Sequence, residues 1–71
     1  MNLGFIGTGE ITKAVVEGII KSNLKYKKIY LSKRNTKISS TLKRQSKKIE
    51  VLKFNQDIID KSNWIFLGVT P

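Results

Sequence analysis

Hydrophobic positions along this chain repeat with two different periods, which predicts strands alternating with helices. Residues 2–7 form a short apolar run with an aromatic and a branched residue, and the run ends in glycine, as a buried first strand does. From residue 10 to about residue 22 the apolar positions follow the spacing of a helix. This stripe comprises Ile11, Ala14, Val15, Gly18 and Ile19. We expect it to pack closely on a sheet, because Ala14 and Gly18 are small.

Three further strands are predicted by shorter apolar runs. Residues 28–32 form the second predicted strand, and residues 49–54, which alternate loosely, form the third. Residues 64–69 are the most apolar segment of the chain. We expect them to form a strand that is covered on both faces.

Two further helices are predicted between these strands. The first is weak and solvated, with Thr36 as its candidate cap. Its marker positions are Ile38, Leu42 and Gln45. Residues 55–60 begin with Asn55, a good cap residue, and carry acids early, which predicts the start of a short helix.

The resulting order, β-α-β-α-β-α-β, predicts an α/β fold with a parallel sheet and right-handed crossovers. Four strands make the first half of a doubly wound, Rossmann-type sheet, with an expected strand order of 3-2-1-4. The fourth strand would then be exposed at one side of the sheet. In an intact sheet a fifth strand would be its neighbour there. We therefore expect this chain to be the amino-terminal part of a longer protein.

A glycine-rich turn connects the first predicted strand to the first predicted helix. It reads Gly7-Thr8-Gly9-Glu10-Ile11-Thr12 and matches the first two glycines of the dinucleotide-binding pattern G-x-G-x-x-G/A. Gly7 permits the tight turn, and Gly9 lets the backbone approach a pyrophosphate at the amino end of the helix. Thr12 stands where the pattern has a small residue. This context favours a pyrophosphate turn, and the alternative is a glycine turn without a ligand.

The end of the second predicted strand bears on which dinucleotide would bind. NAD-binding domains carry an acidic residue there for the ribose 2′-hydroxyl, whereas this chain reads Ser32-Lys33-Arg34-Asn35. A hydroxyl, a guanidinium and an amide suit a 2′-phosphate, because a guanidinium can donate two parallel hydrogen bonds to it. This loop favours NADP over NAD, and the alternative is a solvated basic turn.

Composition narrows the chemistry of the chain. Its 71 residues are 39% hydrophobic and 27% charged, as in a small globular domain. Because the sequence contains no cysteine and no histidine, it excludes disulfides, thiolate chemistry and imidazole catalysis. We predict no catalytic residue and no metal site. With no membrane-length apolar run and no signal-peptide layout, we expect a cytoplasmic protein without a membrane partner.

The charge of the chain is strongly positive and unevenly distributed. The formal net charge is +9, and residues 18 to 49 contain eleven basic residues and no acidic one. This imbalance points either to an anionic partner or to a lysine-rich solvated surface. A nucleic-acid-binding module is a weaker hypothesis, because no recognition motif is present and aromatic residues do not interleave with the basic ones.

The segments GFIGTGEITKAVVEGI, LSKRN and SNWIFLGVTP together resemble the amino-terminal cofactor domain of pyrroline-5-carboxylate reductases. These are NAD(P)H-dependent enzymes of the last step of proline synthesis. The glycine turn alone is shared with β-hydroxyacid dehydrogenases and with F420-dependent NADP reductases. The combination of this turn with Ser-x-Arg-Asn and a terminal Val-x-Pro favours the pyrroline-5-carboxylate reductases among these families.

The resemblance implies a cofactor site spread over four segments. Its pyrophosphate turn would comprise Gly7, Thr8, Gly9, Glu10 and Ile11. The adenosine 2′-phosphate would be held by Ser32, Arg34 and Asn35, with Asn55 near the adenosine end. The backbone passing toward the nicotinamide would be that of Leu67, Gly68, Val69, Thr70 and Pro71, which match Leu-Ala-Val-Lys-Pro in the family. Two departures from the family's pattern matter for the site: Thr12 replaces alanine or glycine, and Thr70 replaces lysine.

The resemblance also implies a function for the complete protein. Residues 1–71 would be a partial NAD(P)-binding Rossmann domain of an oxidoreductase that uses NADPH to reduce 1-pyrroline-5-carboxylate, a cyclic imino acid, to L-proline. The family's substrate pocket and dimer interface belong to a helical carboxyl-terminal domain outside these residues. We therefore expect a homo-oligomer for the complete protein and no turnover from this piece alone. The alternative is the cofactor domain of a related hydroxyacid dehydrogenase or F420-dependent NADP reductase.

Overall fold

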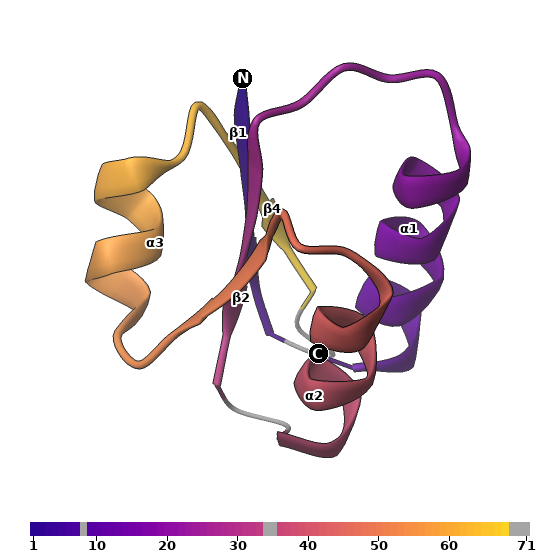
Figure 1. The fold of residues 1–71 in the computed structure, drawn as a ribbon. Coiled ribbons are helices and arrows are strands. Elements are labelled where there is room, and N and C mark those ends of the chain that lie inside the picture. Colours follow the sequence, from indigo (N-terminus) through magenta and orange to yellow (C-terminus); the bar gives the residue numbers. More distant parts are fainter. Residues whose placement is uncertain (8, 34–35, 69–71) are drawn as a thin grey trace.

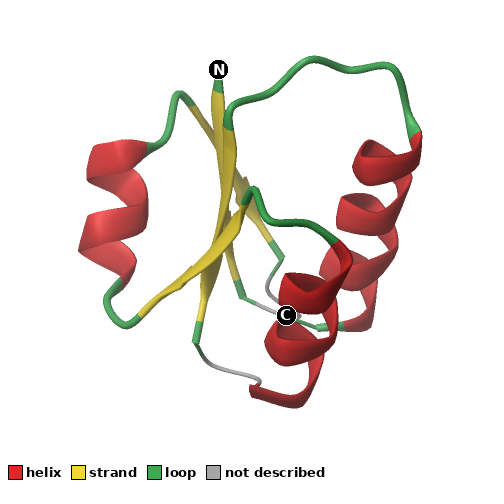
Figure 2. Ribbon diagram, in the orientation of Figure 1, coloured by secondary structure: helices red, strands yellow, loops and turns green. Residues whose placement is uncertain are grey.

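The computed structural model describes residues 1–7, 9–33 and 36–68, and its elements alternate as the sequence predicts (Figures 1 and 2). The strands are β1 (Asn2–Ile6), β2 (Lys28–Ser32), β3 (Ile49–Leu52) and β4 (Trp64–Leu67). The helices are α1 (Glu10–Lys21), α2 (Thr36–Gln45) and α3 (Asn55–Lys61). None of the described helices has the length and apolarity that crossing a bilayer requires.

The four strands form one parallel sheet in the order β3-β2-β1-β4, which confirms the predicted fold and strand order. Helices α1 and α2 lie on one face of this sheet, and α3 lies on the other (Figure 1). The chain moves from β1 outward through β2 to β3 and then crosses back to place β4 on the free side of β1. The carboxyl ends of β1 and β4 therefore flank a topological switch point, where ligands bind in open α/β sheets.

The main core lies between the sheet and the pair of helices α1 and α2. Alternate residues of a strand share a face, so Leu3 and Phe5 of β1 line up with Ile29 and Leu31 of β2 in register. The buried cluster comprises Leu3, Phe5, Val16, Ile29, Leu31, Ile38, Leu42 and Ile49. Each such side chain contributes roughly 1.5–3 kcal/mol relative to an exposed position, so these few residues supply most of the stability of so small a sheet.

The prediction of which face of α1 packs against the sheet was wrong. Thr12 and Val16 are the buried residues of this helix, whereas Ile11 and Val15 are 72% and 39% exposed. Ala14 and Gly18 are also exposed, so their small size does not serve close packing on the sheet. Ile11 and Val15 lie on the flank toward β4, where they line a small apolar hollow with Phe66. The apolar stripe is thus wider than the sheet contact, and no described segment covers its outer edge.

Strand β4 is an exposed edge strand, and the prediction that both its faces are covered was wrong for the described chain. All of its residues are exposed, with Trp64 at 62% and Leu67 at 70%. Its best-covered ring is Phe66, which stacks on Phe5 at 4.7 Å between ring centroids. High apolarity correctly predicts a strand at these residues. The described helices, however, lie over β1, β2 and β3 instead.

Helix α3 packs closely on the opposite face of the sheet because Gly4 of β1 has no side chain. Ile58 of α3 is fully buried there. A Cβ atom at Gly4 would collide with the Ser62 hydroxyl and would lie 2.7 Å from Cγ2 of Ile58. Helix and strand can therefore approach only while this position remains glycine.

We predict opposite effects for two glycine-to-alanine substitutions. Gly4→Ala is expected to destabilise the fold by roughly 1–3 kcal/mol, because the added methyl group overpacks the contact with α3. Gly18→Ala, whose new Cβ has no neighbour within 4 Å, is expected to stabilise α1 by up to about 1 kcal/mol. Urea unfolding of both variants measures this difference, and a Gly4→Ala protein as stable as Gly18→Ala would contradict the packing described.

Candidate dinucleotide-binding site

The carboxyl ends of the strands bring the predicted site residues to one edge of the sheet. The glycine turn follows β1, Ser32 ends β2, Asn55 begins the helix after β3, and Gly68 follows β4. Parallel strands end on the same side, so four segments that are distant in sequence become neighbours.

The turn after β1 has the backbone geometry of an anion site. Gly7 has a φ of 88°, a conformation that residues with a side chain rarely adopt. Gly9 is the N-cap residue of α1, and a Cβ built on it meets nothing within 4 Å. It therefore has no side chain to cap the first N–H groups of the helix, and the space beside it is open. Those N–H groups and the positive end of the helix dipole suit a phosphate, so the turn fits a dinucleotide.

Both backbone polar groups of Gly7 are held by side chains. Its N–H donates to Oγ of Ser32 at 3.1 Å, and its carbonyl oxygen accepts from Oγ1 of Thr12 at 2.7 Å. The end of β4 is linked to the same turn, because the N–H of Gly68 donates to the carbonyl oxygen of Ile6 at 2.8 Å. The position of the turn is thus fixed from β2, from α1 and, through its preceding residue, from β4.

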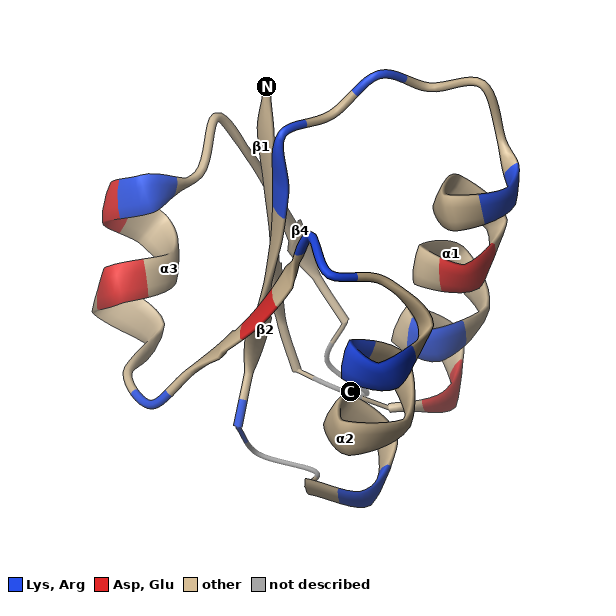
Figure 3. Cartoon of the chain, in the orientation of Figure 1, with Lys and Arg blue, Asp and Glu red and all other residues tan. Residues whose placement is uncertain are grey.

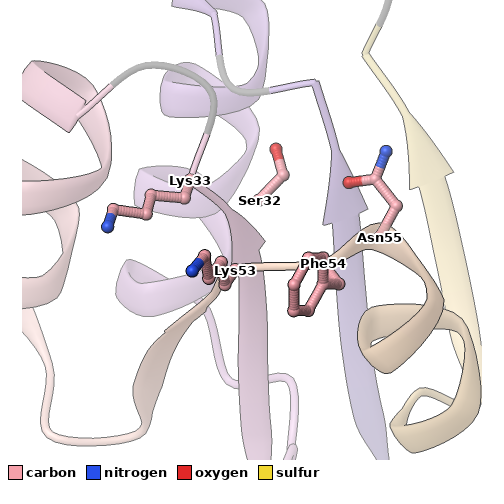
Figure 4. Close-up of a pocket in the computed structure, with 5 residues that line it drawn as sticks. All are labelled: Ser32, Lys33, Lys53, Phe54 and Asn55. Atoms are coloured by element: carbon pink, nitrogen blue, oxygen red, sulfur yellow. The ribbon is translucent and has the colours of Figure 1, made fainter.

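An open pocket lies beside this turn, at the ends of β2 and β3 (Figure 4). It measures about 520 Å³ and is lined by Ser32, Lys33, Lys53, Phe54 and Asn55. In Figure 4 the two lysines extend to one side of the pocket, Phe54 and Asn55 lie on the other, and Ser32 stands between them. Because Ser32 also accepts a hydrogen bond from Gly7, one residue joins the wall of this pocket to the glycine turn.

A second hollow of about 340 Å³ adjoins the first and shares Lys33 and Lys53 with it. Its remaining lining residues are Thr36, Ser39, Ser40, Lys43 and Val51. Three lysines, one from α2 and one each just after β2 and β3, therefore face the two cavities, and no carboxylate is found among the described residues that line them. Figure 3 shows basic residues but no acidic ones on α2. Both cavities consequently present positive charge and hydroxyl groups to a ligand.

Aromatic and amide groups complete the larger pocket. Phe54 is 61% exposed, and Nζ of Lys53 lies 5.6 Å from the centroid of its ring. Asn55 was expected to cap α3, but the N-cap residue is Phe54, and Asn55 is the first residue of the helix. Asn55 is therefore not the cap of α3, and it lines the pocket.

The predicted site residues within the described part of the chain gather at this edge. Gly7, Gly9, Glu10 and Ile11 form the turn and the first residues of α1, while Ser32 and Asn55 line the larger pocket. Leu67 and Gly68 lie at the end of β4, beside Thr12. The predicted residues Thr8, Arg34, Asn35, Val69, Thr70 and Pro71 lie outside the described residues. Ser32 is only 4% exposed, so its hydroxyl belongs to the pocket wall and to the support of Gly7.

The lining residues that sequence reasoning missed include Lys43, Lys53 and Phe54. For the last two the signal was present, because they follow the third strand directly, and its carboxyl end must lie beside that of the second strand. Lys43 comes instead from the last turn of α2, and its approach to the pocket follows from packing.

A protein-family model described as NADP oxidoreductase, coenzyme F420-dependent, matches residues 2–71. The chain belongs to this family. No curated protein and no solved structure matched the sequence. Membership of this family of NADP oxidoreductases confirms the Rossmann-like domain and the broader of the two resemblances. The match does not distinguish pyrroline-5-carboxylate reductases within it.

The support of Gly7 by Ser32 can be tested through stability. Ser32→Ala is expected to cost roughly 1–3 kcal/mol, because it leaves the N–H of Gly7 without this buried acceptor. The same substitution at Ser40, an exposed position in α2, removes a hydroxyl without that loss and serves as the control. Denaturant unfolding of both variants gives the comparison, and equal midpoints would argue against the role of Ser32.

Proposed function

We propose that this chain is the NADP-binding part of an oxidoreductase that reduces 1-pyrroline-5-carboxylate to L-proline. The observation that carries the cofactor assignment is the lysine-lined pocket joined through Ser32 to the glycine turn. Bound NADPH would supply the hydride, and these residues would bind and orient the cofactor. The cyclic imino acid and a second copy of the protein are the partners that this function requires.

Each part of NADP has a counterpart along this edge of the sheet. The pyrophosphate fits the N–H groups at the amino end of α1, where Gly9 leaves open space. The adenosine fits the pocket at the ends of β2 and β3. There the exposed ring of Phe54 offers a stacking surface for the base, and Asn55 offers an amide.

The charge of the pocket supports NADP rather than NAD. A 2′-phosphate would meet Lys33 and Lys53, with the hydroxyl of Thr36 in the adjoining hollow. The sequence places Arg34 and Asn35 in the same loop. The described residues that line the two cavities include no carboxylate that would select the 2′-hydroxyl of NAD.

The choice of substrate rests on the sequence resemblance. Ser-x-Arg-Asn after the second strand and Val-x-Pro at the end of the chain occur together in pyrroline-5-carboxylate reductases. A second candidate is an F420-dependent NADP reductase, and the description of the matched family favours it. Both functions use the same NADP site, so the substrate decides between them.

Cofactor preference tests the first part of the proposal. In calorimetric titrations of the intact protein, NADP is expected to bind at least about tenfold more tightly than NAD, because charged hydrogen bonds to the 2′-phosphate add roughly 1.5–3 kcal/mol. Lys33→Ala and Lys53→Ala are each expected to weaken NADP binding by about tenfold while changing NAD binding little. Lys47→Ala, in the exposed turn before the amino end of β3, is the matched control and should bind both nucleotides like the wild type. Equal affinities of the wild type for NADP and NAD would refute the 2′-phosphate site.

Turnover tests the second part. With NADPH and 1-pyrroline-5-carboxylate, the intact protein is expected to oxidise NADPH and form proline in equal amounts, measured by absorbance and by amino-acid analysis. Oxidised coenzyme F420 in place of the imino acid tests the second candidate. NADPH oxidation with F420 and none with the imino acid would transfer the assignment to that reaction.

A further inference from the structure

Thr12 occupies the position where the dinucleotide-binding pattern has glycine or alanine, and it makes a contact that neither could make. Its side chain is almost completely buried, with 3% exposure. Its hydroxyl donates to the carbonyl oxygen of Gly7 at 2.7 Å, across five residues of sequence. The hydroxyl therefore binds the residue at which the chain turns from β1 toward α1.

Gly68, at the end of β4, makes room for this hydroxyl. A Cβ atom built on Gly68 would overlap Oγ1 of Thr12 and would lie 2.8 Å from the carbonyl oxygen of Gly7. Contacts that short force something to move, and one of the two groups is backbone. Any side chain at position 68 would therefore compete with the hydrogen bond from Thr12 to Gly7.

The two positions deviate from the resembled family in opposite directions. Position 12 is larger than the usual alanine or glycine, while position 68 is glycine where the family has alanine. In this chain the larger side chain of the pair is therefore on α1, and it carries a hydroxyl. The threonine that weakened the motif match is accommodated by a residue 56 positions later in the chain.

We infer that Thr12 is a positioning residue for the pyrophosphate turn and that Gly68 is its steric partner. The hydroxyl holds the carbonyl oxygen of Gly7 on the protein side of the turn, while Ser32 holds the N–H of the same residue. With both groups fixed, the amino end of α1 is preorganised for an anion. This inference rests on the proposed cofactor function for its binding role, whereas the steric pairing does not depend on it.

The binding role is tested with single variants of the intact protein. Thr12→Ala is expected to weaken NADPH binding by about five- to tenfold, because the carbonyl oxygen of Gly7 loses its partner. Thr12→Ser keeps the hydroxyl and should bind within about twofold of the wild type. Adenosine 2′-monophosphate, which lacks the pyrophosphate, should bind all three proteins alike. Thr12→Ala with wild-type NADPH affinity, or Thr12→Ser as weak as Thr12→Ala, would overturn the positioning role.

The steric pairing is tested by thermal unfolding of Gly68→Ala in two backgrounds. With Thr12 present, the added methyl group is expected to lower the melting temperature by about 5–10 °C. With Thr12→Ala, the same change should cost less than half as much, because the hydroxyl that it meets is gone. Equal losses in the two backgrounds would overturn the pairing. A wild-type protein that binds no NADPH would refute the proposed function and the positioning role with it, and would leave this stability comparison to decide the pairing alone.

Discussion

Two hydrogen bonds at one glycine hold the functional edge of this fold together. Gly7 donates to Ser32 at the end of β2 and accepts from Thr12 on α1, so a single residue ties the sheet to the helix on its face. Its φ of 88° turns the chain sharply enough for α1 to begin just after β1. Because Ser32 also lines the larger pocket, a shift of the turn would be transmitted to the pocket wall. The anion site and the pocket are therefore parts of one structure.

The fold gathers several of the basic residues of the chain around two cavities. Lysines from α2 and from just after β2 and β3 reach two adjoining cavities, while acidic residues lie on α1, α3 and β3 (Figure 3). Charges concentrated at concave sites attract anionic ligands more effectively than the same charges spread over a surface. Three of the fourteen basic residues thus stand together, next to a backbone arrangement that also favours anions. Nucleic-acid binding, which needs no such pocket, remains the weaker hypothesis.

Much of this architecture could be predicted from hydrophobic periodicity, because strands and helices impose different spacings on the residues they bury. The glycine turn was located correctly for the same reason: it falls where one period gives way to the other. The rotation of α1 could not be predicted in this way. Ile11 and Val15 belong to its apolar stripe, yet which part of a stripe meets the sheet depends on the neighbours available. The contact of the Thr12 hydroxyl illustrates the same limit. It depends on the carbonyl group of Gly7 and on the absence of a side chain at Gly68, which only the folded chain brings near it.

The exposed strand β4 contains an intrinsic fluorophore. Trp64 is the single tryptophan of the sequence, and it lies at the amino end of this strand with 62% of its surface exposed. The residues proposed to bind the nucleotide gather at the other end of the sheet, so tryptophan emission would respond weakly to a ligand there. Any segment or molecule that covers the edge of β4 would remove water from the indole ring and shift its emission to shorter wavelength. The natural fluorescence of this protein therefore reports on the state of its open edge, independently of its cofactor.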